Sequence, residues 1–204
     1  PVDAIRSQRA ARDEQPRLWN VPDSHVELVH EYRLGGVLLW QLCRFWSQYR
    51  VEHNAKAKPR HVGEDGRWYL GQGPWKGQQK PLYRQDEAVN ELRLGGKVWI
   101  VEGERDADAV WDVGCIAVCN PDGAGCFREH QARTLVDAMR EGEPAAELCI
   151  VADDDEKGLG HAQQARRMLL ALDSSLRHRI EVVLPPVGCK DVAEFLTRGG
   201  ASHG

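Results

Sequence analysis

The sequence predicts an α/β fold, in which a parallel sheet of about four strands is flanked by helices and preceded by a small, β-rich basic lobe. From residue 95 onward, short apolar runs rich in β-branched residues alternate with segments whose apolar residues recur every three or four positions. This pattern is typical of strands alternating with amphipathic helices. Before residue 95, short apolar runs are separated by turns that contain Gly and Pro, as in antiparallel sheets. We therefore expect two domains, residues 1–94 and residues 95–204.

The N-terminal domain is expected to contain a hairpin. Val26 to Tyr32 and Val37 to Trp46 are apolar runs, and the Gly35-Gly36 pair between them suits a tight turn. A polar loop from Glu52 to Arg67 is expected next, followed by the short apolar run Trp68 to Leu70. Several glycines and a proline then predict irregular backbone.

The C-terminal domain shows the regular alternation. A helix from Gln85 to Leu94, ended by Gly95-Gly96, is expected to join the two domains. Apolar periodicity then predicts strands at Val98–Val101, Cys115–Cys119, Leu148–Ala152 and Ile180–Leu184, and helices at Glu104–Val113, Arg128–Arg140, Glu156–Leu172 and Val192–Thr197. Strands joined by helices in this way form a parallel sheet with right-handed crossovers.

Composition narrows the function classes. The chain has 204 residues, is 42% hydrophobic and has no apolar run long enough to span a membrane, so we expect no membrane partner and a cytoplasmic location. The six cysteines include no CxxC pair, which favours reduced, buried thiols. A zinc site can be drawn from Cys115, Cys119, Cys126 and His130, but its spacing fits no familiar ligand pattern. No structural zinc is expected.

The net charge of -4 argues against nucleic acid, but the charge is unevenly distributed. The stretch from Cys43 to Arg84 contains nine Lys and Arg residues but only three acids, and six Trp and Tyr residues lie among them. Cations for phosphates and aromatic rings for bases are typical of a surface that binds single strands. The alternative is that the aromatics fill a small core and the cations are ordinary surface residues. The candidate nucleic-acid-binding residues are Arg44, Arg50, Lys56, Lys58, Arg60, Trp75, Lys76 and Lys80.

Carboxylates follow two of the expected parallel strands. Glu102 comes after the strand that ends at Val101, and Asp153 and Asp155 come after the strand that ends at Ala152. Ligands bind at the carboxyl ends of strands in open α/β sheets. Acids that converge there repel one another unless one is protonated or a cation joins them, and oxygen ligands favour Mg²⁺ or Mn²⁺. Glu102 and Asp153 could instead only cap the following helices.

The wording "EGERD" around Glu102 and "DDDEKG" around Asp155 resembles the Toprim domain, and within it the primase branch. The resemblance covers about half the chain, from roughly Lys97 to Leu196. It implies that Glu102, Asp153 and Asp155 are catalytic and bind Mg²⁺ or Mn²⁺, and that Asp106 matches a further acid of the motif. Lys190-Asp191 matches a Lys-Asp pair of that branch, so Asp191 is a further candidate ligand or, alternatively, an N-cap.

Four residues near the same sheet edge are candidates for binding phosphate or nucleotide: Gly123, Gly125, Lys157 and Lys190. Glycines let backbone amides approach a phosphate closely, although such loops are common. Asp154 is expected to point away from the other aspartates by strand alternation. His161, one turn into a helix, is expected to be a surface histidine.

Three functions remain open. The resemblance implies a primase-like, metal-dependent nucleotidyltransferase that makes RNA primers on single-stranded DNA. The alternatives are a Toprim nuclease and a non-catalytic protein that binds nucleic acid. The implied partners are single-stranded DNA or RNA, nucleoside triphosphates, and a replicative helicase or other replication proteins.

Overall fold

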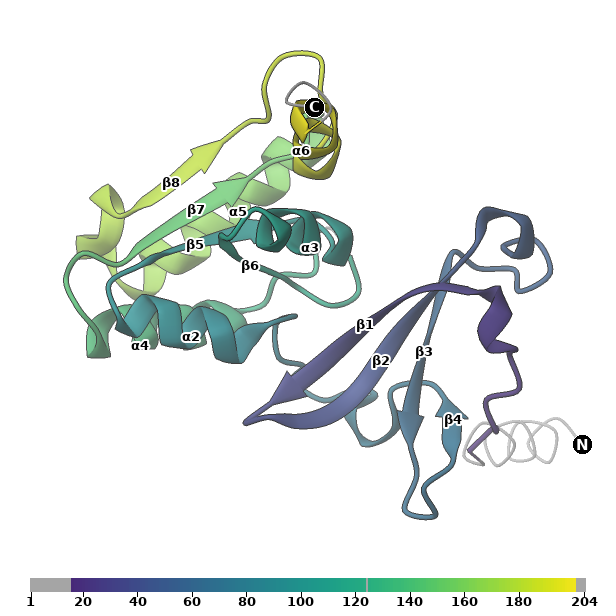
Figure 1. Cartoon of the computed structure of the whole chain (residues 1–204). Coiled ribbons are helices and arrows are strands. Elements are labelled where there is room, and N and C mark those ends of the chain that lie inside the picture. Colours follow the sequence, from purple (N-terminus) through teal and green to yellow (C-terminus); the bar gives the residue numbers. More distant parts are fainter. Residues whose placement is uncertain (1–15, 124, 201–204) are drawn as a thin grey trace, which may run out of the picture. The chain divides into compact units, whose positions relative to one another are not determined.

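The computed structural model describes residues 16–123 and 125–200, which form two compact units (Figure 1). The first unit holds the described residues up to Tyr32 together with Val37–Gln78, and the second holds Arg33–Gly36 and the residues from Gln79 onward. The segment 79–94, which the sequence placed with the N-terminal domain, thus lies in the second unit. The reason is burial, because Leu82 and Leu92 are fully buried in the core of the second unit.

The first unit is built on an antiparallel sheet with the strand order β1-β2-β3-β4. Its strands are β1 (Val26–Leu34), β2 (Val37–Phe45), β3 (Ala57–Val62) and β4 (Trp68–Leu70), and short 3-10 helices lie at Asp23–His25 (η1), Ser47–Tyr49 (η2) and Gly73–Trp75 (η3). Gly35 and Gly36 both have positive φ, as a two-residue hairpin turn requires.

Strand β3 corrects the expectation of a loop from Glu52 to Arg67. Half of its residues are polar (Lys58, Arg60 and His61), and Ala and Pro are poor strand formers, so its sequence carries little strand signal, yet it pairs with both neighbours. Gln41 of β2 lies opposite Arg60, and Arg60 lies opposite Leu70 of β4. Backbone pairing within the sheet therefore decides the conformation of this segment, and the apolar pattern does not.

Aromatic residues form much of the core of the first unit. Tyr32, Trp40, Cys43 and Phe45 are buried, and the Tyr32 and Trp40 rings stack with centroids 4.4 Å apart. Trp75 packs against Trp40 at 6.1 Å. Trp75 therefore contributes to this core, as the alternative interpretation of the aromatic residues holds.

The second unit contains the predicted parallel sheet, which confirms the α/β fold class (Figure 1). Its strands, in the order β6-β5-β7-β8, are β5 (Lys97–Val101), β6 (Ile116–Cys119), β7 (Glu147–Val151) and β8 (Ile180–Val183). The helices are α2 (Gln85–Arg93), α3 (Glu104–Asp112), α4 (Glu129–Glu141), α5 (Glu156–Leu172) and α6 (Val192–Gly200), with a 3-10 helix at Ser174–His178 (η4).

Helices cover both faces of this sheet. Helix α4 packs against α2 and α5, and α3 packs against α6. The connection from β5 to β6 runs toward one edge of the sheet, and the connection from β6 to β7 runs in the opposite direction, past β5. Because both crossovers are right-handed, their helices α3 and α4 lie on opposite faces of the sheet. The buried apolar face of each helix supplies the core, for example Leu135 and Met139 of α4 and Leu169 of α5.

The strand order places a topological switch point at the centre of the sheet. β5 and β7 are neighbours, with Ile100 paired to Ile150, and the connections that leave their carboxyl ends run toward opposite edges of the sheet. A crevice forms where such connections diverge, and ligands of open α/β sheets bind there. Glu102 and Asp153 follow these two strands.

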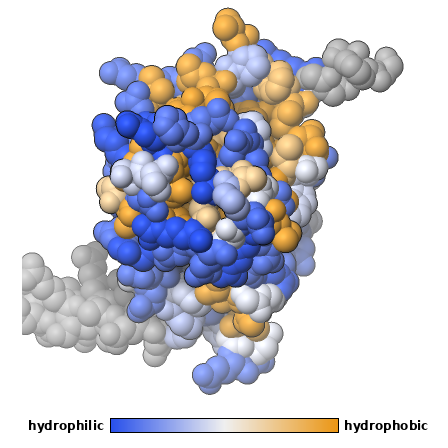
Figure 2. Space-filling view, turned by 90° about the vertical axis from the view of Figure 1, so that its left-hand side faces the viewer, coloured by the Kyte–Doolittle hydropathy of each residue, from blue (hydrophilic) through white to orange (hydrophobic). Residues whose placement is uncertain are grey.

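The visible surface of the molecule is mostly hydrophilic, and its apolar side chains lie in scattered groups (Figure 2). None of the helices within residues 16–123 and 125–200 combines the length and the apolar character needed to cross a bilayer.

Candidate active site at the carboxyl edge of the parallel sheet

Glu102 and Asp153 lie together at the switch point. Burial and the neighbouring Glu102, through its charge and as a hydrogen-bond partner, raise the pKa of Asp153 from 3.8 to about 7. The Asp191 carboxylate adds to this rise, and the Lys190 ammonium opposes it. Two carboxylates held this close favour either a shared proton or a cation between them.

Gly158 permits the position of Asp153. A Cβ added to Gly158 would lie 2.8 Å from the backbone nitrogen, the carbonyl oxygen and the Cβ of Asp153. Real Cβ contacts essentially never come this close, so any other residue here would displace the aspartate loop. The glycine five residues after the first aspartate of "DDDEKG" therefore has a packing role at the site.

Asp155 caps helix α5. Its Oδ1 accepts a hydrogen bond of 2.6 Å from the backbone N–H of Gly158, and its backbone is extended, as an N-cap requires. Asp155, and not Asp153, is therefore the N-cap of α5. Asp154 is exposed, and its backbone N–H donates to the carbonyl of Lys190 at 2.9 Å.

Asp106 and Asp191 add negative charge to the same edge. Burial raises the pKa of Asp106 to about 6, and the charges of Asp191 and Asp153 add to this rise. A 3.3 Å hydrogen bond from the backbone N–H of Ala193 acts in the opposite direction and lowers the pKa. Asp191 caps α6, since its Oδ1 accepts from the backbone N–H of Glu194 at 2.8 Å. The structure therefore brings Asp106, Asp153 and Asp191 within electrostatic reach of one another.

The donor set of this edge fits a hard divalent cation. Mg²⁺ is usually held by one or two carboxylates and completes its octahedron with waters and substrate phosphates. Glu102 and Asp153 supply two such carboxylates, and a bound cation would relieve the electrostatic repulsion between them. No three acids of this edge, within the described ranges, have oxygens that all lie within 4.8 Å of one another.

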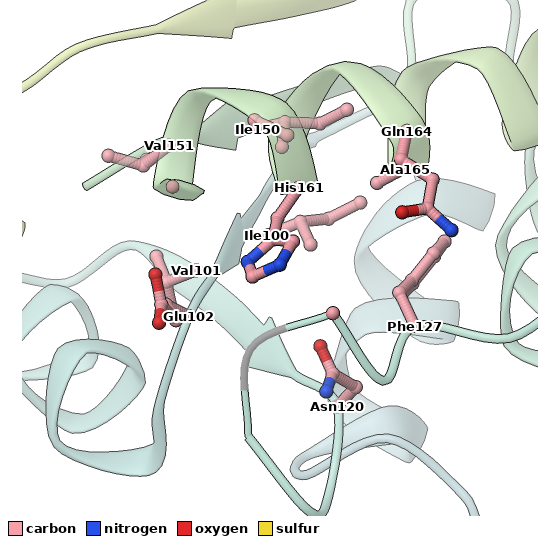
Figure 3. Close-up of a pocket in the computed structure, with 13 residues that line it drawn as sticks. Ile100, Val101, Glu102, Asn120, Phe127, Ile150, Val151, His161, Gln164 and Ala165 are labelled. Carbon is pink, nitrogen blue, oxygen red and sulfur yellow. The ribbon is translucent and has the colours of Figure 1, made fainter. Parts of the chain in front are cut away.

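A pocket opens beside Glu102 (Figure 3). The hollow measures about 470 Å³ when the open solvent at its mouth is included. Its lining combines residues at the ends of β5 and β7 with residues of α5 and of the loop after β6. The lining residues are Ile100, Val101, Glu102, Asn120, Gly125, Phe127, Ile150, Val151, Gly158, His161, Ala162, Gln164 and Ala165. It is thus largely apolar, with a few polar groups at its edge, as small-molecule sites generally are.

The glycine loop after β6 is held by Asn120. The buried side-chain amide of Asn120 donates to the carbonyl oxygens of Pro121 and Gly123, at 3.3 and 2.5 Å. Gly123 and Gly125 both adopt positive φ. The two glycines were predicted from the sequence but Asn120 was not, because its only signal is its position directly after a strand.

His161 is half-buried and lies on the pocket wall (Figure 3). Its Nδ1 is buried, and a Cβ added to Gly125 would lie 2.8 Å from its Nε2. The loop after β6 therefore packs against this turn of α5, a contact that helical position alone does not show. Lys157 and Lys190, the two cations proposed for phosphate, are exposed.

Several of the candidate nucleic-acid-binding cations form hydrogen bonds and ion pairs within the protein. The side chain of Arg60 is only 12% exposed, lies over the Trp68 ring at 4.4 Å and donates to Gln41 at 2.8 Å. Arg50 donates to the carbonyl of Phe45 and pairs with Glu27. These arginines therefore stabilise the β lobe.

Lys80 lies in the second unit, where it pairs with Asp122 at 2.6 Å. Arg44 and Lys58 are half-buried, and Lys56 and Lys76 are exposed. Of the eight candidates, Lys56 and Lys76 therefore present the most accessible charges.

The comparisons with known proteins concern the fold. No protein-family model matches the sequence, and no curated protein matches it. Among solved structures, the chain is similar to the RNA polymerase domain of the Mycobacterium tuberculosis primase DnaG in complex with double-stranded DNA carrying a six-nucleotide overhang. That match has a TM-score of 0.61 and 20% identity, and covers 96% of this chain and 60% of the other.

A second structure of the same domain of this primase matches with a TM-score of 0.55 and 15% identity over 96% of this chain and 63% of the other. The chain thus spans less than two thirds of the length of these domains. In fold, the chain is an α/β protein with an antiparallel β lobe, similar to the RNA polymerase domain of a bacterial primase.

Proposed function

We propose that this chain is a primase-like nucleotidyltransferase, which binds a single-stranded template and joins ribonucleotides in a reaction that depends on Mg²⁺ or Mn²⁺. The observation that carries the proposal is the pairing of Glu102 with Asp153 at the switch point of the sheet, with Asp106 and Asp191 adding charge. The similarity in fold to primase polymerase domains supports it.

Glu102 and Asp153 are the proposed ligands of the catalytic cation, and Asp106 and Asp191 are the proposed acids of a second position. Asp155 is proposed to orient the loop by capping α5, with Oδ2 left to contribute to the site. A bound divalent cation would neutralise triphosphate oxygens and offset the charge that develops during phosphoryl transfer. No protein nucleophile is needed, since the attacking group is a hydroxyl of the growing strand.

The nucleotide is proposed to lie between the acids and the pocket beside Glu102. Backbone amides near Gly123 and Gly125 would approach phosphate oxygens, and Lys157 and Lys190 would add positive charge. The apolar walls around Ile100 and Phe127 suit a flat base or ribose face. The exposed Lys56 and Lys76 are proposed to contact the template backbone.

A nuclease would use the same acids, and a binding protein would use the same lysines. The resemblance in sequence and the similarity in fold both point to primases, which favours synthesis over these alternatives. A replicative helicase or another replication protein is the class of partner that such a role implies.

The test is a primer-synthesis assay with single-stranded template, labelled ribonucleoside triphosphates and Mg²⁺ or Mn²⁺. New oligonucleotides are expected with the wild type and not with Glu102→Gln or Asp153→Asn. Asp154→Asn is the matched control, since Asp154 is exposed in the same loop and should retain activity. A shortened template would indicate a nuclease, and a mobility shift alone a binding protein. Full activity of Asp153→Asn would refute the site.

A further inference from the structure

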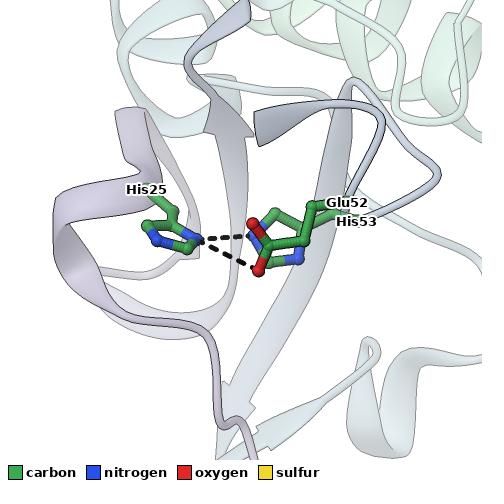
Figure 4. Close-up of side chains that lie close together, drawn as sticks. All are labelled: His25, Glu52 and His53. Carbon is green, nitrogen blue, oxygen red and sulfur yellow. Dashed lines mark hydrogen bonds and ion pairs between the residues drawn. The ribbon is translucent and has the colours of Figure 1, made fainter. Parts of the chain in front are cut away.

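The β lobe contains a second cluster of potential metal ligands, formed by His25, Glu52 and His53 (Figure 4). In the described part of the chain, this is the only group of three His, Cys, Asp or Glu residues whose ligand atoms all lie within 4.8 Å of one another. His25 ends η1, and the other two residues belong to the turn after η2. Segments distant in the sequence thus converge on one point.

The distances within the cluster are close to those around a tetrahedral metal. The His25 Nδ1 and His53 Nε2 atoms are 3.0 Å apart, and the His25 Nδ1 and Glu52 Oε1 atoms are 3.8 Å apart. Zinc binds imidazole nitrogen and carboxylate oxygen at about 2.0–2.2 Å, so tetrahedral ligands are separated by roughly 3.3–3.5 Å. The two observed separations bracket this range, so small side-chain movements would complete the site.

Backbone hydrogen bonds and ring contacts fix the ligand positions. The carbonyl of His25 accepts from the backbone N–H of Trp46, and the backbone N–H of His53 donates to the carbonyl of Tyr49. The Tyr49 ring stacks on the His25 ring at 3.7 Å, and Phe45 contacts His53 with ring centroids 4.3 Å apart. Both imidazoles are therefore half-buried and held in place before any metal binds.

We propose that His25, Glu52 and His53 bind one Zn²⁺ ion, which links the start of β1 to the turn after η2. Two imidazoles and one carboxylate form a donor set typical of zinc, whereas Mg²⁺ prefers oxygen ligands alone. Three protein ligands leave a fourth position for water or another ligand. A bare hydrogen bond between the two histidines is the competing explanation of the 3.0 Å contact.

This proposal departs from the sequence expectation of no structural zinc, which rested on the cysteines. The set drawn from Cys115, Cys119, Cys126 and His130 does not come together at ligand distances in the described structure. The His25, Glu52 and His53 site is also chemically separate from the carboxylate edge of the parallel sheet. It depends on no assumption about primer synthesis, because its readout is metal binding.

The experiment titrates ZnCl₂ into the chelator-treated full chain by calorimetry, with excess Mg²⁺ present to occupy the carboxylate edge. We expect one Zn²⁺ per chain, with a dissociation constant at least about tenfold lower than in His25→Asn or His53→Asn. His178→Asn is the matched control, because His178 is exposed on η4, and it should bind as the wild type does. Equal affinity in all four proteins, or no binding in the wild type, would overturn the proposal.

A second variant keeps the test decisive if removal of a histidine impairs folding. His53→Cys retains a metal ligand at the same position, and with Co²⁺ it should show a thiolate-to-cobalt charge-transfer band that the wild type lacks. A Co²⁺ spectrum of folded His53→Cys identical to that of the wild type would show that residue 53 does not bind the metal.

Discussion

The paired carboxylates at the sheet edge should make the metal-free protein lose stability as the pH rises. The folded-state pKa of Asp153 is raised from 3.8 to about 7 by burial and by Glu102. Between these values the folded chain holds a proton that the unfolded chain has released, so the free energy of unfolding falls as the pH increases. Asp106, with its pKa raised to about 6, acts in the same direction.

The Asp153→Asn substitution measures the contribution of one carboxyl group. A rise of about three pKa units corresponds to about 4 kcal/mol. Because the Asp153 side chain is partly exposed and screened by solvent, we expect about 1–2 kcal/mol. At about pH 8, with chelator present, the variant should therefore be more stable than the wild type by that amount, a rise of about 2–8 °C in the thermal midpoint. At about pH 3, below the ordinary pKa of 3.8, Asp153 is largely protonated in both states, so the two proteins should unfold at similar temperatures.

The assay is thermal unfolding of both proteins across this pH range, with and without Mg²⁺. Addition of Mg²⁺ at about pH 8 should stabilise the wild type and have little effect on Asp153→Asn. A wild type that gains stability as the pH rises from 4 to 7, or a variant that is less stable at every pH, would refute this account of the site.

Three further predictions concern residues around the site and in the β lobe. In thermal unfolding, Gly158→Ala should destabilise the protein by about 1–3 kcal/mol, because the added Cβ would clash with the aspartate loop. Gly160→Ala in the same helix is the control: its Cβ would meet no atom within 4 Å, so it should be neutral or stabilising. Arg60→Lys should cost about 1–2 kcal/mol in urea unfolding of the β lobe, because the stacking on Trp68 is lost; an unchanged midpoint would contradict this. Lys56→Gln and Lys76→Gln should each lower the magnitude of the slope of log affinity against log salt by about 0.7 for single-stranded DNA, with unfolding midpoints unchanged.

The helices and strands of the second unit were predictable because each has a strong apolar period. Their ends, apart from that of α6, fall within one residue of the expected positions. The sheet order was not predictable, since it depends on contacts between strands distant in sequence. That order is what makes the crevice between β5 and β7 the candidate site.

The residues of the candidate site were predictable only in part. Glu102 and Asp153 follow apolar strands, and this position alone indicated that they would meet. The N-cap geometry of Asp155 and the hydrogen bonds of Asn120 depend on local backbone conformation that the sequence does not display. Strand β3 was missed because its charged side chains carry no apolar alternation, and its pairing with β2 and β4 determines its conformation.

Direct measurement of Mn²⁺ binding by electron paramagnetic resonance tests the central claim, that carboxylates from β5 and β7 together hold a divalent cation. The His25, Glu52 and His53 site would first be saturated with Zn²⁺. We predict that the wild type and Asp154→Asn bind Mn²⁺ equally, and that Glu102→Gln and Asp153→Asn each weaken binding by about tenfold or more. Equal Mn²⁺ affinity in all four proteins would contradict the account.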